Sequence, residues 1–300
     1  MLSTVATILM IIVGLSMLYI LYRTIKGQPI ERRYVFLYIA LAISLPLLMQ
    51  KTAPVPVTRD VMKLVDALNE LPPGSKVLAA FDYDPPSAPE LQPMGVAFMK
   101  FAFKHDLQVI IMGLWPQGPQ QANQAILEAM KDPEIAAKNL QYGVDYVNLG
   151  FQSGNEFVIQ SMGSNFKRMF PKDDRLIPYD SLPIMNSVTN FSNIDFVFNL
   201  SSGKPGTVEW VQIAVDRFGA KCGAGNTAVQ APQVYPYLRT GQLTGLLGGM
   251  SGGAEFEKAL DEEGKASTFI FSQMISHATV IAFILIGNVA FFMSRKKKKQ

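Results

Sequence analysis

The 300-residue chain has a single cysteine, Cys222, and two histidines. One thiol cannot form an intramolecular disulfide, so the fold must be stabilised by its core alone. Nucleophilic catalysis needs a serine or cysteine beside a base, but His105 is the only histidine between the hydrophobic ends of the chain. It lies between a predicted helix and the start of a strand, which is the wrong end of a parallel sheet for a site. No catalytic residue is predicted.

Motifs for acyl transfer and phosphate binding are missing as well. The chain has no G-x-S-x-G nucleophile elbow. Its glycine-rich segments 202–206, 222–226 and 248–253 lack the Walker spacing and the dinucleotide fingerprint. We expect the glycines of 248–253 to allow close helix packing instead. No cofactor is predicted.

Charged residues are absent from three long hydrophobic segments, 2–22, 34–50 and 268–294. These segments approach or exceed the roughly 20 apolar residues that a membrane-spanning helix needs. We predict a transmembrane helical hairpin over 1–50, with spans 2–22 and 34–50, and a third span over 268–294. His277, inside the third span, is expected to contribute to helix packing.

Two clusters of basic residues flank these segments. Both belong on the cytoplasmic side, because cytoplasmic loops carry the excess of Lys and Arg. The domain 51–267 is then extracytoplasmic, and the basic tail 295–300 is cytoplasmic. The sequence predicts a protein integral to the plasma (inner) membrane of a prokaryote. Its topology determinants are Arg23, Lys26, Arg32, Arg33, Arg295, Lys296, Lys297, Lys298 and Lys299.

The net charge of +3 conceals an acidic domain. Nine of the 27 Lys and Arg residues, but only one acidic residue, Glu31, lie in the flanks, so residues 51–267 retain 18 basic and 23 acidic residues. Nucleic-acid binding depends on neutralising phosphates with positive charge. Nucleic acid is therefore excluded as a partner, and we expect the lipid bilayer together with protein partners or a homo-oligomer.

Apolar runs alternate with helical patterns through residues 51–267. Strands are predicted at 76–83, 107–115, 145–151, 195–201 and 220–225. Helices are predicted at 58–71, 90–105, 119–130, 133–142, 154–170, 207–218 and 254–260. Such alternation is typical of a parallel, doubly wound sheet. The predicted fold class is α/β, a membrane-anchored Rossmann-like extracytoplasmic domain flanked by two N-terminal transmembrane helices and one C-terminal one.

In open parallel sheets, ligands bind beyond the carboxyl ends of the strands, near the point where the strand order reverses. Polar and aromatic residues follow several of the predicted strands. A candidate ligand-binding rim consists of Asp82, Asp84, Trp115, Gln152, Ser201, Ser202 and Gly203. A similar rim forms wherever strands emerge into solvent, so both interpretations stay open.

Asp82 and Asp84 stand two residues apart in the segment Asp-Tyr-Asp-Pro-Pro. On an extended strand end, two such carboxylates point the same way and can hold Mg²⁺ or Ca²⁺, or act as an acid/base pair. They can also cap the turn that the two prolines open. The turn is favoured, so no metal site is predicted. Ser153 and Glu156 are likewise given a structural role, as a helix capping box.

Met94, Phe98, Phe101 and Phe103 make the helix at 90–105 apolar almost all round. Such a helix must be buried, either in the core or against another subunit. Phe98, Phe101 and Phe103 do not share one face, so two neighbours are implied, which favours an assembly. With no catalytic set and no charged path in the spans, the leading hypothesis is a non-catalytic membrane protein. Its outer domain would be an interaction or structural module of a larger membrane assembly. One alternative is a membrane-tethered sensor or binding protein for a small polar ligand, and a second is a carboxylate-dependent hydrolase.

Overall fold

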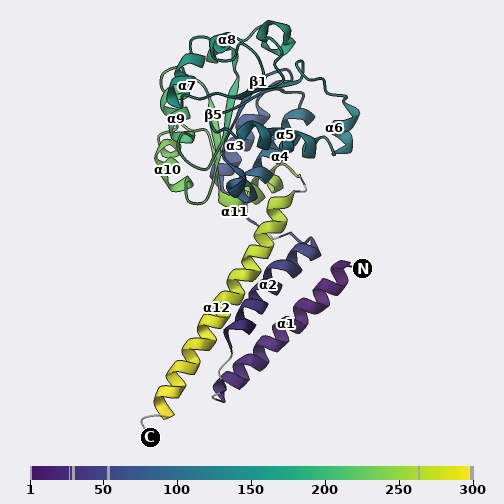
Figure 1. Cartoon of the computed structure of the whole chain (residues 1–300), viewed down its shortest axis with the longest axis vertical. Coiled ribbons are helices and arrows are strands. Elements are labelled where there is room, and N and C mark those ends of the chain that lie inside the picture. The colour runs from purple at the N-terminus through teal and green to yellow at the C-terminus, as the bar shows by residue number, and fades with distance from the viewer. Residues whose placement is uncertain (1, 27, 29–30, 53–54, 263, 298–300) are drawn as a thin grey trace. The chain divides into compact units, whose positions relative to one another are not determined.

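The computed structural model describes residues 2–26, 28, 31–52, 55–262 and 264–297. The chain divides into two compact units (Figure 1). The helical unit contains residues 1–54 and 267–300, and the α/β unit contains residues 55–266.

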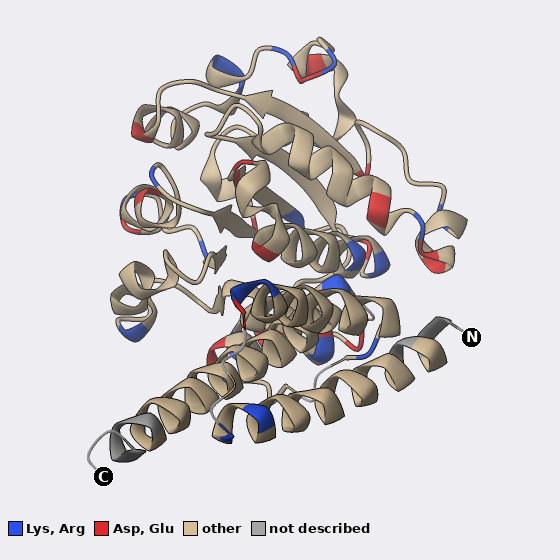
Figure 2. Ribbon diagram, turned by 60° about the horizontal axis from the view of Figure 1, so that its bottom comes forward, with Lys and Arg blue, Asp and Glu red and all other residues tan. Residues whose placement is uncertain are grey.

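Three long helices form the helical unit. They are α1 (Leu2–Ile25), α2 (Arg32–Met49) and α12 (Lys265–Lys297), whose first two residues belong to the α/β unit. Each helix is long and apolar enough to cross a membrane. Figure 2 shows long stretches of these helices without charged residues. The three predicted spans therefore coincide with helices.

The predicted topology determinants lie at the ends of these helices. Arg23 is in the last turn of α1, Lys26 follows that helix, and Arg32 and Arg33 begin α2. The backbone of residues 295–297 forms the end of α12. Lys298 and Lys299 lie outside the described residues.

Polar contacts join the helices of the helical unit. The hydroxyl groups of Ser16 in α1 and Tyr38 in α2 are 2.5 Å apart. Ser272 Oγ in α12 donates to the backbone carbonyl of Ile43 in α2 at 2.8 Å. The Tyr38 ring also meets Phe283 of α12 edge-on, with 5.6 Å between ring centroids. Hydrogen bonds of this kind are a usual means of association between membrane helices.

A six-stranded parallel sheet forms the centre of the α/β unit, in the order β3-β2-β1-β4-β5-β6. The chain starts in the middle of the sheet, builds outward on one side, and then returns to the other side of β1. This is the strand order of a Rossmann fold, with its switch point between β1 and β4. The strands are β1 (Lys76–Asp82), β2 (Gln108–Gly113), β3 (Tyr146–Phe151), β4 (Phe196–Ser201), β5 (Cys222–Asn226) and β6 (Leu246–Gly248).

Helices cover both faces of the sheet (Figure 1). One face packs against α3 (Arg59–Asn69), α4 (Ala88–Lys104), α5 (Gly118–Ala129), α6 (Pro133–Ala137) and α11 (Gly249–Ala259). The other face packs against α7 (Glu156–Met162), α8 (Phe166–Met169), α9 (Thr207–Trp210), a π-helical turn over Val211–Val215, and α10 (Ala231–Arg239). Because side chains alternate along a strand, Leu78 and Ala80 of β1 enter the second core, whereas Ala79 and Phe81 enter the first. Short 3-10 turns occur at Pro85–Ser87, Tyr179–Ser181, Pro183–Met185 and Phe191–Asn193.

Two elements, α10 and β6, were not predicted. Pro236 lies inside α10, where a proline normally ends a helix, and β6 has only three residues. The predicted helix at 133–142 ends at Ala137, and the one at 154–170 is divided into α7 and α8.

The predicted capping box at Ser153 and Glu156 is wrong. The N-cap of α7 is Asn155, which has φ of 49° and makes no side-chain capping bond. Gly154 before it also has a positive φ, 132°, so the chain enters the helix through a turn that a capping box does not allow. Glu156 instead lies 3.8 Å from Lys204 Nζ.

Helix α4 is buried within its own domain. Phe98 stacks on Phe198 of β4 with 4.2 Å between ring centroids, and Phe103 meets Tyr146 of β3 at 5.8 Å. Both rings are almost completely inaccessible to solvent. The apolar character of α4 is thus accounted for by the α/β unit alone, and it gives no evidence for an assembly.

Helix α11 holds both segments that connect the α/β unit to the rest of the chain. At the entering segment, Glu255 accepts hydrogen bonds from the backbone N–H and the hydroxyl of Thr58, at 2.9 and 2.6 Å. Lys258 Nζ donates to the carbonyl of Val55 at 2.7 Å. At the leaving segment, Glu257 accepts from the backbone N–H of Ala266, in the first turn of α12, at 2.8 Å. Entry and exit therefore meet at one helix.

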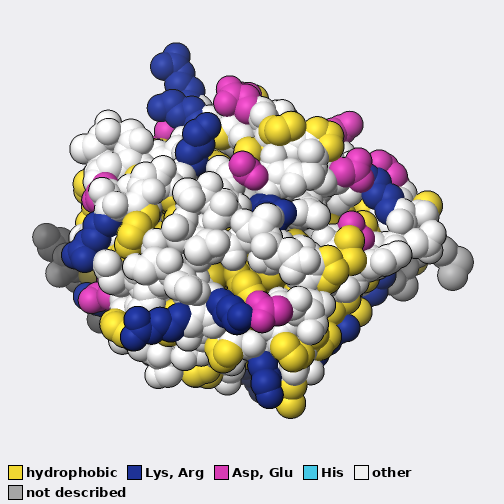
Figure 3. All heavy atoms as spheres, turned by 90° about the horizontal axis from the view of Figure 1, so that it is seen from above, with side chains coloured by type: hydrophobic (Ala, Val, Ile, Leu, Met, Phe, Trp, Pro, Cys, Tyr) yellow, Lys and Arg dark blue, Asp and Glu magenta, His cyan; other side chains and the backbone are white. Residues whose placement is uncertain are grey.

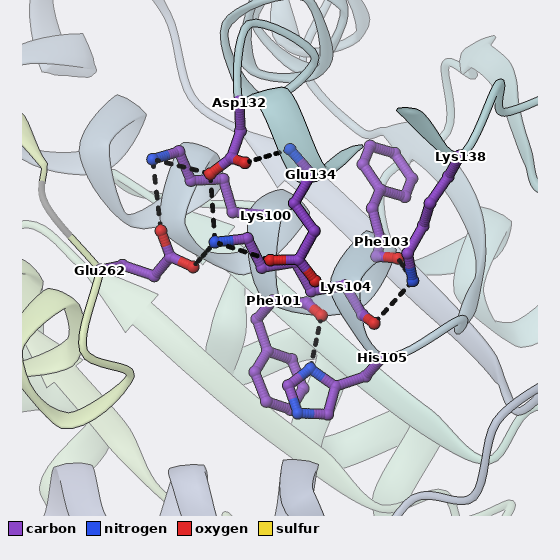
Figure 4. Close-up of polar contacts among 9 residues, drawn as sticks. All are labelled: Lys100, Phe101, Phe103, Lys104, His105, Asp132, Glu134, Lys138 and Glu262. Atoms are coloured by element: carbon purple, nitrogen blue, oxygen red, sulfur yellow. Dashed lines mark hydrogen bonds and ion pairs between the residues drawn. The ribbon is translucent and has the colours of Figure 1, made fainter. Parts of the chain in front are cut away.

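Ion pairs fix the leaving segment further (Figure 4). Lys100 and Lys104, on one side of α4, both bind the carboxylate of Glu262, and the Lys100 contact is 3.3 Å. Asp132 lies 3.1 Å from Lys104 Nζ and completes the group. The side chains of Lys100, Lys104 and Glu262 are each at most 21% exposed, so solvent screens these pairs less than ordinary surface pairs.

From the hydrogen bonds between Thr58 and Glu255 we predict that Glu255 contributes to the stability of the α/β unit. Replacing Glu255 by alanine should lower the free energy of unfolding of the α/β unit by about 2 kcal/mol, because it removes two hydrogen bonds from Thr58 to a buried, charged acceptor. Both tryptophans of the chain, Trp115 and Trp210, lie in this unit. Urea denaturation of the detergent-solubilised chain, followed by tryptophan fluorescence, therefore reports on it.

Glu134→Ala is the matched control. The Glu134 side chain is 62% exposed and its ion pair with Lys104 spans 4.0 Å, so its loss should cost no more than about 0.5 kcal/mol. Equal effects of the two substitutions would contradict a structural role for Glu255.

Candidate functional site

The carboxyl ends of the parallel strands bring most of the predicted rim residues to one edge of the sheet. Asp82 at the end of β1 is in register with Ser201 at the end of β4. Gly113 of β2 is in register with Phe151 of β3, and the backbone N–H of Gln152 donates to the Gly113 carbonyl at 3.2 Å. The residues that follow β1, β2, β3 and β4 thus share the edge that contains the switch point.

Asp82 is enclosed at this edge, with 0% of its surface exposed. Its Oδ1 accepts from the backbone N–H of Leu114, directly after β2, at 2.7 Å. Its Oδ2 accepts from the Asn199 amide in β4 and from the Trp210 indole in α9, each at 2.7 Å. One carboxylate therefore connects β1 to the end of β2, to β4 and to α9.

The network continues from β4 to α9 and β5. Thr207 Oγ1 donates to the Asn199 side-chain carbonyl at 2.6 Å, and the Asn226 amide donates to Thr207 Oγ1 at 2.9 Å. All three side chains are completely buried. Asn199, Thr207 and Trp210 were not among the predicted site residues. An asparagine within the apolar run of β4 was the one sequence signal for this network.

Burial raises the pKa of the Asp82 carboxyl from 3.8 to about 7, because desolvation disfavours its charged form. The donors on Leu114, Trp210 and Asn199 act in the opposite direction, and the negative charge of Glu209 adds to the rise. These three donors favour the charged carboxylate but offset only part of the desolvation, so the net effect is a raised pKa.

Asp84 does not join this network. Its Oδ1 accepts from the hydroxyl of Ser87 at 3.1 Å, and its backbone carbonyl accepts from the Ser87 N–H at 3.0 Å. These are the bonds of the turn that Pro85 and Pro86 occupy. Asp82 and Asp84 therefore have separate environments, one enclosed and one at a turn.

The loop after β4 is packed against its surroundings. The indole of Trp115 donates to the Pro205 carbonyl at 2.8 Å. A side chain added at Gly203 would lie 3.2 Å from the Trp115 ring, so the ring covers this glycine closely. The N–H of Gly206, at the start of α9, donates to Glu209 at 2.8 Å. A group that in other proteins is suited to anion binding is here occupied by a carboxylate of the chain itself.

Ser202 carries a hydroxyl oxygen that is buried and has no hydrogen-bond partner among the described residues. Its neighbour Ser201 is satisfied, because its Oγ donates to the Gly203 carbonyl at 3.1 Å. The described residues contain no group of three or more His, Cys, Asp or Glu side chains placed to hold a metal ion. Cys222, in β5, is buried and free.

Comparisons of this chain with protein-family models, with curated proteins and with solved structures gave no match.

The raised pKa of Asp82 predicts how stability depends on pH. Between pH 4 and 7 the folded unit binds a proton that the unfolded chain has released, so the free energy of unfolding should fall as pH rises. A shift of about three units corresponds to about 4 kcal/mol, and the loss should level off above pH 7. Asp82→Asn cannot titrate and should lack this component.

The measurement is urea denaturation of wild type and Asp82→Asn by tryptophan fluorescence from pH 4.5 to 8. The difference in unfolding free energy between them isolates Asp82, because every other titrating group is common to both. A difference that stays constant over this range would contradict the raised pKa.

Proposed function

We propose that this chain is a non-catalytic membrane protein whose Rossmann-like α/β unit lies outside the cytoplasm and acts as an interaction or structural module of a larger membrane assembly. The observation that carries the non-catalytic part is the environment of Asp82. This carboxylate, at the position where a Rossmann-like fold would place chemistry, is fully enclosed and already accepts three hydrogen bonds from its own chain. A general base must reach its substrate directly or through one water.

The membrane part rests on length, composition and charge. Three helices are long and apolar enough to span, and the basic residues of the ends gather in residues 23–33 and 295–299. The positive-inside tendency then favours a cytoplasmic location for both clusters. The α/β unit would then lie on the opposite side of the membrane, connected to a membrane-spanning helix at each of its two ends.

The interaction part is supported by the surface and by the connections of the α/β unit. Helix α11 holds both connecting segments, as a module fixed to a membrane anchor requires. On the face drawn in Figure 3, apolar side chains are interspersed with charges of both signs. Phe157, Leu176 and Val229 are each more than 60% exposed.

The sensor alternative has one observation in its favour, the buried and unpartnered hydroxyl of Ser202 beside Gly203 and Trp115. A thermal-shift screen of metabolites and divalent ions tests this alternative, and no stabilisation of the wild type would contradict it. The hydrolase alternative receives less support, because Asp82 is enclosed and Asp84 is bonded to Ser87.

The location is tested by cysteine labelling with a membrane-impermeant maleimide. Val229→Cys, at a position that is 85% exposed, should react in intact spheroplasts. Gln28→Cys, between α1 and α2, should react only after lysis. The native Cys222 gives a low background, because it is completely buried and burial raises the pKa of its thiol to about 12.

Labelling of Gln28→Cys in intact spheroplasts, with Val229→Cys protected, would reverse the proposed orientation. The unsubstituted chain should remain unlabelled in both preparations, which checks the background from Cys222.

The assembly is tested on chain purified from its native membranes in a mild detergent. The expected particle is heavier than one 33.1 kDa chain plus its detergent, as measured by light scattering with subtraction of the detergent mass. A strictly monomeric particle with no co-purifying partner would count against the module.

A further inference from the structure

Helix α12 carries three polar side chains larger than serine or threonine within its uncharged segment 268–294. Gln273, His277 and Asn288 are all exposed in the helical unit. At 3.6 residues per turn they fall within about 60° of one another around the helix axis. Ile284, 57% exposed, lies between them on the same side. The three polar side chains and Ile284 therefore lie along one side of α12, and we call these four residues the α12 stripe.

Several hydroxyl side chains of the helical unit form hydrogen bonds within it. Ser44, Ser276 and Thr279 each donate to a carbonyl four residues earlier in their own helix, and Ser272 donates across to α2. Short hydroxyl side chains do this readily. Of the stripe residues, Asn288 makes the same kind of bond, whereas Gln273 and His277 do not within the described part of the chain.

Gln273 and His277 have no hydrogen-bond partner among the described residues. Asn288 donates its amide to the Ile284 carbonyl at 3.0 Å, but its side-chain oxygen accepts nothing from the described part of the chain. In a bilayer such groups are costly to expose to lipid, and they usually face another helix or a water-filled cavity. Neither α1 nor α2 covers the stripe.

We propose that the α12 stripe is an interface with a second copy of this chain, in which two α12 helices pack in parallel. This inference rests on the proposed function, because it takes α12 to lie in a membrane. It goes further by naming the partner and the surface. All copies inserted with the same topology present their α12 helices in the same direction, so a two-fold pair is parallel and brings each residue near its own counterpart.

Hydrogen-bonding chemistry selects a second copy as the occupant. Glutamine, asparagine and neutral histidine each carry both a donor and an acceptor. Each can therefore bond to the same residue of the other copy, which an ammonium group or a carboxylate cannot do. The uncharged segment 268–294, which contains the stripe, adds no like-charge repulsion. Pairing of two α12 helices thus supplies hydrogen-bond partners for side-chain donors and acceptors of the stripe that have none among the described residues of one chain.

Cysteine cross-linking along α12 tests the interface. Ile284→Cys, on the stripe, should give a disulfide-linked dimer under mild oxidation in membranes. Leu285→Cys is the matched control, because Leu285 is adjacent, is similarly exposed at 61%, and points about 100° away around the axis. The dimer yield at Ile284→Cys should exceed that at Leu285→Cys several-fold. Cys222 stays in place, since it is completely buried.

A second measurement uses the particle mass of the purified chain, expressed in a foreign host, in mild detergent. Wild type should be a dimer, and the double variant Gln273→Leu/His277→Leu should be largely monomeric. Leucine is well tolerated in a membrane helix, and unchanged tryptophan fluorescence of Trp115 and Trp210 would show that the α/β unit remains folded. Met274→Leu, at a 52% exposed neighbouring position, should leave the dimer intact.

Three results would overturn the inference: a monomeric wild type, equal cross-linking at positions 284 and 285, or a double variant that remains dimeric. Resistance of the chain to alkaline extraction from membranes separates this failure from failure of the proposed function. An integrated monomer contradicts only the stripe interface, whereas a chain released by alkali contradicts the membrane anchor itself.

Discussion

The carboxylate of Asp82 is the contact on which the arrangement of the α/β unit depends. It lies at the switch point of the sheet, completely buried, and binds donors from the end of β2, from β4 and from α9. A buried charge is tolerable only when its lone pairs are satisfied. The dependence is mutual, because the Asn199 amide and the Trp210 indole would themselves be buried donors without an acceptor if Asp82 were absent. Such a network specifies one position for α9 against β1 and β4, the strands on either side of the switch point.

A Rossmann-like strand order does not by itself imply a particular activity. Fold and function are separable, and function depends on the groups at the site. At this carboxyl edge the groups bind one another: Trp115 bonds to Pro205, Gly206 bonds to Glu209, and Asp82 is enclosed. Ligand binding would require these contacts to be exchanged for contacts with the ligand, at a cost that a preformed open site does not have. These contacts stabilise the domain at its carboxyl edge.

The parallel α/β architecture could be predicted from the sequence, because strands buried on both faces must be nearly continuous apolar runs. The runs at β1, β2 and β4 have this form, and the predicted ends of these strands lie within two residues of the observed ones. The network was not predictable, because Asp82, Asn199 and Trp210 are distant in sequence and meet only through strand register and helix packing. Local rules failed where the backbone takes unusual angles, as at Gly154 and Asn155. They also failed where an element is very short, as in β6.

Charge also bears on where two copies of this chain can associate. Residues 51–267 carry 18 basic and 23 acidic residues, so two such domains repel each other weakly over the Debye length of roughly 8 Å at physiological salt. The uncharged segment of α12 lacks this repulsion, and its open donors and acceptors gain more from a partner than from lipid. Association through α12 would also leave the mixed surface of the α/β unit accessible. Under the proposed function, the spans would join copies and the outer module would contact other members of the assembly.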